Sequence, residues 1–257
     1  MATTIHARRP GPKAWLRLIQ AEARMTARDT AGLIVPLGMP LLILVMQAIS
    51  FDDLHQELAP DVTVLDYYLL PVVLTMVVTT IAVINMPSFL ATYRKTKLLR
   101  RLAVTPASPA MVLVAQFVVS FLQVLLGIAA AFTVAVVFFD ANLPQSLLVA
   151  VGVLLVCCAA MYGVGMIVAS IAPTPNSAVA IGLVFFFGLA ALGGMFGPVE
   201  NLPETLAEIS GWLPFAAAVE AFQSAWLGEA VDAQNWLVLG GTAVLGGGVS
   251  AALFRWE

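Results

Sequence analysis

Six long apolar runs dominate the sequence, and their cores contain no acidic, basic or histidine residue. Each run is close to, or longer than, the roughly 20 residues that cross a hydrocarbon core of about 30 Å. With 61% hydrophobic and 11% charged residues, the chain is far more apolar than a soluble domain. The sequence therefore predicts an all-α integral membrane protein with six transmembrane helices, at residues 33–51, 67–90, 110–139, 145–171, 177–196 and 236–254.

The first run has an alternative interpretation as a cleaved signal peptide, because Ala48-Ile49-Ser50 faintly resembles a cleavage site. The polar leader and the apolar run are both long for a signal peptide, and further runs follow. We therefore favour an uncleaved span. Residues 1–30 then form an N-terminal cytoplasmic segment, and residues 31–257 form a single six-span transmembrane domain.

The positive charges indicate the orientation of these spans. Six of the twelve Lys and Arg residues precede the first run, five lie between the second and third runs, and Arg255 follows the sixth. All twelve fall on one side of a six-span layout, and cytoplasmic loops are the ones enriched in Lys and Arg. We therefore expect both termini in the cytoplasm, with the acidic loops outside.

The segment between the fifth and sixth runs, residues 197–235, has a pattern unlike that of an ordinary loop. Its apolar second half is interrupted by Pro214 and Glu220, and its first half carries two further prolines. This pattern favours an extracytoplasmic re-entrant helical hairpin at residues 198–227 over a seventh span. The residues that we single out in this hairpin are Pro198, Glu200, Leu202, Pro203, Glu204, Leu213, Pro214, Phe215 and Glu220.

Several functions are excluded by the residues that the sequence lacks. The adjacent Cys157 and Cys158 lie in an apolar run without other metal ligands, and we expect both to pack in the core. With only His6 and His55 as histidines and no phosphate-binding or nucleophile motif, we expect no metal site, no bound cofactor and no enzymatic activity. No soluble basic domain is present, so we expect no nucleic-acid binding. Within the spans we expect four amides to form interhelical hydrogen bonds: Gln47, Asn85, Gln116 and Gln123.

Residues 12–28 have the pattern of a basic amphipathic helix just before the first span. Apolar side chains share one face of this helix, and three arginines recur on another. Such a helix lies in the headgroup layer of a membrane, although a solvated leader is the alternative. The residues that we place at the membrane interface are Trp15, Leu16, Arg17, Ile19 and Arg24.

The loop at residues 91–109 predicts a second cytoplasmic helix, at about residues 94–104. Three leucines share one face of it, and Pro106 disfavours a helical conformation at Thr105. A short basic helix with an apolar stripe can dock into a groove on a partner, whereas a simple topology loop explains only its charges. The candidate contact residues are Arg94, Lys95, Lys97, Leu98, Leu99, Arg100, Arg101, Leu102, Thr105 and Pro106.

Taken together, these segments resemble the membrane (permease) subunit of type-two ABC transporters, in particular the daunorubicin-resistance-type export permeases. The resemblance covers nearly the whole chain and includes the N-terminal helix, the six spans, and the segments at residues 98–106, 198–204, 212–215 and 226–228. Family members usually have an Arg-Glu-x-Gly pattern at the start of the cytoplasmic loop. Lys95 and Lys97 replace its Glu and Gly here, so an acidic contact to an ATPase is not carried over.

The resemblance implies a permease of an ATP-driven exporter in a bacterial-type plasma (inner) membrane. Two permease chains, identical or closely related, would assemble with two separate ATPase subunits, which bind ATP and Mg, and would contact membrane lipids. The implied substrate is amphipathic or lipophilic, and is a drug, a lipid or a glycan. If the substrate is a drug, the chain would serve antibiotic resistance. The alternatives are a non-transporting scaffold or immunity protein, or a secondary carrier. The lack of ionisable groups in the spans argues against a proton-coupled carrier.

Overall fold

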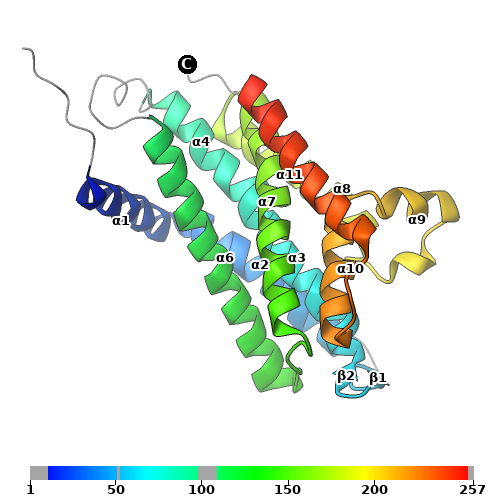
Figure 1. Ribbon diagram of the computed structural model, residues 1–257. Coiled ribbons are helices and arrows are strands. Elements are labelled where there is room, and N and C mark those ends of the chain that lie inside the picture. Colours follow the sequence, from blue (N-terminus) through cyan, green and yellow to red (C-terminus); the bar gives the residue numbers. More distant parts are fainter. Residues whose placement is uncertain (1–10, 51–52, 98–108, 254–257) are drawn as a thin grey trace, which may run out of the picture.

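The computed structural model describes residues 11–50, 53–97 and 109–253, which are almost entirely helical (Figure 1). Predictions for residues 98–106, and for both ends of the chain, lie outside these ranges. The elements are α1 (Pro12–Arg28), α2 (Thr30–Ser50), β1 (Glu57–Ala59), β2 (Val62–Thr63), η1 (Leu65–Leu69), α3 (Leu70–Thr79), η2 (Thr80–Asn85), α4 (Met86–Lys95), α6 (Pro109–Phe139), α7 (Leu147–Ile171), α8 (Pro175–Leu192), η3 (Val199–Asn201), α9 (Glu204–Ser210), α10 (Pro214–Leu227) and α11 (Ala233–Leu253).

Five segments of the described chain are long and apolar enough to cross a membrane. They are α2, the continuous helix Leu65–Lys95, α6, α7 and α8, and they correspond to the first five predicted spans. The helix α11 lies at the predicted sixth span and packs beside α7, but it is not among these five (Figure 1). The chain is therefore a multi-pass membrane protein, and the six-span layout stays a prediction.

The helix Leu65–Lys95 forms the centre of the bundle. Of its most apolar stretch 94% is buried, against 22% to 44% for the other four candidate spans. It contacts α2, α6, α7, α8 and α10. The helix begins with the π-helical segment η1, and a second one, η2, interrupts its α-helical course; such segments are frequent at functional sites. Neither π-helical segment is predicted by the sequence analysis.

Glycines allow the neighbouring helices to approach η2 closely. A Cβ atom on Gly165 of α7 would lie 1.9 Å from the carbonyl oxygen of Ala82, and one on Gly182 of α8 would lie 2.6 Å from that of Val83. Real Cβ contacts are never so short, so both positions require glycine. The helices α7 and α8 therefore pack against η2 backbone to backbone, as is common for membrane helices.

The predicted role of the two cysteines in packing is confirmed. Cys157 and Cys158 lie in α7 as free, buried residues of the main apolar core. At the far end of the bundle, β1 and β2 form an antiparallel pair in which Glu57 is opposite Thr63. Asp61 in the turn between them has a φ of 58°. This small sheet connects α2 to the central helix.

Candidate functional site

Each of the two opposite ends of the bundle carries a group of charged side chains. One end, which we call the basic end, is formed by α1, the last turn of α4 and the α7–α8 connection. The end formed by the β1–β2 pair and the α6–α7 connection is the acidic end. Among the described residues, every Lys and Arg lies in α1 or between residues 94 and 97, and therefore at the basic end.

At the basic end, Arg94 binds the C-terminal end of α7. Its guanidinium donates hydrogen bonds to the carbonyl oxygens of Ala169 and of Ala172, the latter at 2.8 Å. The last carbonyls of a helix have no partner within it, so a basic side chain there satisfies them and also interacts well with the helix dipole. Arg94 therefore fixes the end of α4 to the end of α7.

This position of Arg94 corrects the predicted start of the cytoplasmic helix. Arg94 and Lys95 form the last turn of the central helix rather than the first turn of a new one. The helix ends there because Lys97 has a φ of 55°, in the left-handed region. Lys95 and Lys97 are exposed, and the leucines and the proline predicted to follow lie outside the described residues.

The helix α1 covers the same residues, Pro12–Arg28, that the sequence predicts for the amphipathic helix. It lies across α6 rather than along it (Figure 1). Trp15 and Ile19 are half-buried against the bundle, whereas Arg17 and Arg24 are exposed. Leu16, which we expected on the same face as Trp15, is 57% exposed, so the apolar face is split between protein and surroundings.

The inward face of α1 carries a buried acid that the sequence analysis missed. Glu22 is 5% exposed, and its carboxylate accepts a hydrogen bond from the hydroxyl of Tyr93, next to Arg94 in α4. The same hydroxyl lies 3.2 Å from Oε1 of Gln116 in α6, whose amide donates to Ser120 at 3.4 Å. Burial raises the pKa of the Glu22 carboxyl, although the hydrogen bond from Tyr93 opposes this.

Replacing Glu22 tests the effect of this raised pKa on stability. The folded protein binds the Glu22 proton more tightly than the unfolded chain does. The resulting stabilisation is complete below the ordinary carboxyl pKa of 4.5 and is lost as the pH rises through the raised pKa. We expect Glu22→Gln, which mimics the protonated acid, to lose this decline and to exceed the wild type in stability at neutral pH. The gain is about 1.4 kcal/mol for each unit of pKa.

Thermal unfolding in detergent, measured from about pH 4 to about pH 8, spans the ordinary carboxyl pKa and values raised above it. Glu204→Gln is the matched control, because Glu204 is an exposed acid in α9. Equal pH dependence of the wild type and Glu22→Gln would contradict the prediction.

A second hydrogen-bonded cluster lies deeper in the bundle, on the same face of α6. The side-chain amides of Asn85 and Gln123 both donate to the carbonyl oxygen of Gly32, at 2.9 and 2.8 Å. Asn85 also donates to Gln123 at 3.0 Å. Together with the contact between Gln116 and Tyr93, these bonds confirm the predicted interhelical hydrogen bonds of Asn85, Gln116 and Gln123. Gln47 instead donates to the carbonyl of Met195 in the turn after α8. The interhelical bonds connect α2, η2, α4 and α6.

At the acidic end, Asp66 joins Thr63 of β2 to the connection between α6 and α7. Its carboxylate is fully buried and accepts hydrogen bonds from the backbone and hydroxyl of Thr63 and from the backbone and amide of Asn142. The carbonyl of Asn142 in turn accepts a hydrogen bond from the indole of Trp226 in α10. The sequence analysis predicts only an acidic loop outside the membrane here. The i−3 spacing of Asp66 from Thr63 is the local signal of a capping contact.

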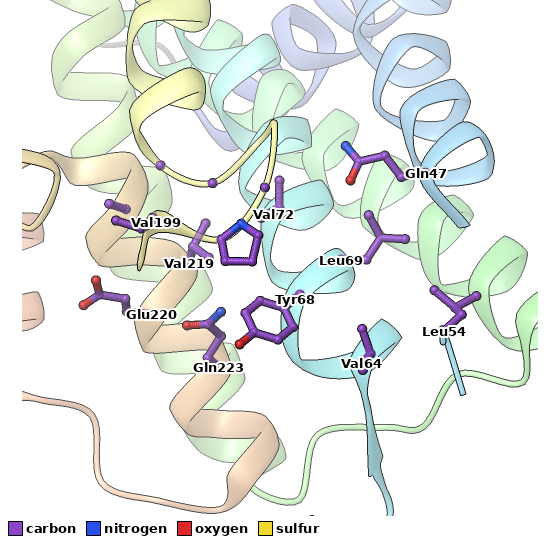
Figure 2. Close-up of a pocket in the computed structure, with 15 residues that line it drawn as sticks. Gln47, Leu54, Val64, Tyr68, Leu69, Val72, Val199, Val219, Glu220 and Gln223 are labelled. Carbon is purple, nitrogen blue, oxygen red and sulfur yellow. The ribbon is translucent and has the colours of Figure 1, made fainter. Parts of the chain in front are cut away.

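A cavity of about 190 Å³ opens near the same end of the bundle (Figure 2). It lies between the ends of α2 and η1, the loop after α8, and α10. Of the residues that the sequence analysis singled out, Pro198, Glu220 and Gln47 line it. The cavity itself and the contributions of Tyr68 and Gln223 were not foreseen, because they depend on how η1 packs against α10.

The remaining residues of the predicted hairpin lie in η3, α9 and α10. Pro214 and Phe215 are buried at the start of α10, and Leu213 just before them is half-buried. Glu200 lies in η3, Leu202 is half-buried, and Pro203 and Glu204 are exposed at the start of α9. The segment therefore forms two helices, α9 and α10, and its depth in the membrane stays a prediction.

The fold and these polar clusters define a multi-pass helical membrane protein. No group of His, Cys, Asp and Glu suited to a metal ion occurs within residues 11–50, 53–97 and 109–253. The family model of the ABC-2 type transporter matches residues 13–227, and the chain belongs to this family. ABC-2 permeases are membrane components of transporters and not enzymes themselves, and they generally act as dimers with an ATPase subunit. Comparison with curated proteins gives no match.

Proposed function

We propose that this protein is the permease subunit of an ATP-driven exporter. Two permease chains, identical or closely related, would form the translocation pathway and bind two separate ATPase subunits, which carry ATP and Mg. The observation that supports this function best is the family match, which extends from α1 through α10. Family membership also favours a transporter over a scaffold or immunity protein.

The contacts of α4 support a route by which an ATPase would drive the permease. The segment that we propose to dock on the ATPase, residues 98–106, directly follows α4. The last turns of α4 are bound to α1 through Tyr93 and Glu22, and to α7 through Arg94. A displacement of the docking segment would therefore move three helices together rather than a single loop.

The proposed orientation has both termini and the basic end in the cytoplasm of a bacterial-type inner membrane. It rests on six spans, with α11 as the sixth, and on the location of all twelve Lys and Arg residues on one side. The cavity at the acidic end would then open outward. The substrate would be amphipathic or lipophilic, in keeping with the daunorubicin-resistance type of permease, and the direction would be export.

Purification of the tagged chain from its native membranes tests this function. We expect an ATP-binding subunit to co-purify in equal amount, and the complex in lipid nanodiscs to hydrolyse ATP while the permease alone does not. A chain that purifies without an ATPase but transports along an ion gradient, even after ATP depletion, would show a secondary carrier instead.

A further inference from the structure

The outer face of α1 carries a row of positive charges. All four basic residues of the helix belong to it, and all four are exposed: Lys13, Arg17, Arg24 and Arg28. With 3.6 residues per turn, these positions fall within about 60° of arc and extend along about 22 Å of the helix. We call these four residues the basic row.

The described part of the chain does not neutralise the basic row. Within residues 11–50, 53–97 and 109–253, none of its four side chains forms an ion pair or a hydrogen bond. The acid of α1, Glu22, is buried and accepts the hydrogen bond from Tyr93. Asp29, just after α1, accepts a hydrogen bond from the backbone N–H of Gly32 at 3.1 Å. Like charges that follow one helix face repel each other, so an anion outside the described chain would stabilise this face.

The apolar face of α1 is covered by protein. Trp15 and Ile19 are half-buried there, Glu22 and Thr26 are buried, and α1 contacts α6 and α2 (Figure 1). An isolated amphipathic helix would insert this face into a bilayer, but the bundle already occupies it. By helix geometry, Glu22 lies about 180° around the helix from Lys13, so the basic row points away from the bundle. Contact with the surroundings therefore falls to the basic row and its flanks.

The position of α1 places the basic row at the surface of the membrane. The helix ends at Arg28, and α2, the first candidate span, begins at Thr30. With one residue between them, α1 lies at the level of the lipid headgroups. Exposed apolar side chains border the row on both sides, since Leu16 is 57% and Met25 39% exposed. Cations flanked by apolar side chains suit the boundary between headgroups and hydrocarbon better than they suit water.

We propose that the basic row binds the phosphate groups of anionic phospholipids. Arginine suits this role because its planar guanidinium can donate two parallel hydrogen bonds to one phosphate. Attraction to an anionic lipid surface also grows with each basic residue near it. Glu22 joins the opposite face of α1 to Tyr93 of α4, so bound lipids would hold α1 beside the end of α4. This inference goes beyond the proposed function, because it requires neither an ATPase nor a transported substrate.

Lipid binding to the purified, immobilised permease tests the proposal. The permease is titrated with neutral detergent micelles that contain phosphatidylglycerol or, as the zwitterionic counterpart, phosphatidylcholine, and the retained lipid is quantified by mass spectrometry. We expect tighter binding of phosphatidylglycerol, without competition from inorganic phosphate. The double variant Arg17→Gln/Arg24→Gln should weaken phosphatidylglycerol binding about 25-fold, or about fivefold for each charge, and leave phosphatidylcholine binding unchanged. Arg17→Lys/Arg24→Lys keeps both charges and should retain most of the binding.

The matched control is Lys95→Gln/Lys97→Gln, which removes two exposed positive charges from the same end of the bundle but outside α1. This variant should bind phosphatidylglycerol almost as the wild type does. Equal affinity of the wild type and Arg17→Gln/Arg24→Gln for phosphatidylglycerol would overturn the proposal, and so would an equal loss in the control, which would indicate net charge alone. If Arg17→Gln/Arg24→Gln instead lost ATPase association and kept its lipid preference, the basic row would be a protein contact. The lipid assay contains no ATPase subunit, so its outcome is independent of the proposed function.

Discussion

Gly165→Ala should destabilise the protein strongly, although it adds only one methyl group. The added Cβ would lie 1.9 Å from the carbonyl oxygen of Ala82 and 2.9 Å from its carbonyl carbon. Both atoms belong to the backbone of η2, which is buried between α7 and α8 and has no space to shift. Overpacking of a core side chain costs about 1–3 kcal/mol, and a clash with buried backbone lies at or above the upper end.

Gly152→Ala is the matched control in the same helix. A Cβ at Gly152 would meet only the ring of Trp236, at an ordinary contact distance of 4.0 Å. Because alanine favours a helix over glycine by about 1 kcal/mol, this variant should be neutral or slightly stabilised. Thermal unfolding and the monodisperse yield in detergent compare the two variants. Similar unfolding temperatures for both would show that α7 does not pack on η2 as described.

The sequence predicted the helices well because their signal is local. Each apolar run extends over the length of a span, and α6, for example, covers Pro109–Phe139 where residues 110–139 were predicted. The amphipathic helix was located to the residue, since Gly11 and Pro12 provide a helix start and Asp29 ends the helical conformation. These features depend only on neighbouring residues, so a single sequence is enough to find them.

The polar clusters could not be predicted, because they depend on contacts between distant segments. Glu22 and Tyr93 are 71 positions apart, and Asp66 and Asn142 are 76 apart. Glu22 was overlooked because the face of its helix was chosen from apolar residues alone. The π-helical segment η2 was missed for a related reason, since it packs closely against Gly165 and Gly182 and composition does not reveal that packing.

The predicted start of the cytoplasmic helix at Arg94 is wrong, because Arg94 belongs to the last turn of α4. Its position in a basic loop suggested a surface charge at the edge of a partner contact. The structure instead shows a half-buried side chain that binds the end of α7, because α4 continues one turn beyond the predicted span. A change at Arg94 would therefore disturb the permease itself and cannot serve as a mild control for ATPase docking.

Leu99→Asp should abolish the association with the ATPase while the permease still inserts into the membrane. If the leucines of residues 98–102 contact a groove on the ATPase, the new carboxylate would be buried there without a partner. Burial of an unpaired polar group costs about 2–7 kcal/mol, and burial of a charge costs more. The Lys and Arg residues that determine topology all remain, so membrane levels should be unchanged.

The control for Leu99→Asp is Lys95→Gln, because Lys95 is exposed in the last turn of α4 and its loss removes one surface charge. Surface charge pairs contribute only about 0–1 kcal/mol, so this variant should keep most of the association. Co-purification with the ATPase, ATP hydrolysis and membrane abundance are measured for both variants. Full association and full ATP-driven transport by Leu99→Asp would leave residues 98–106 with a role in topology alone. The contact that drives the permease would then have to lie elsewhere at the basic end, where Arg17 and Arg24 of α1 are exposed.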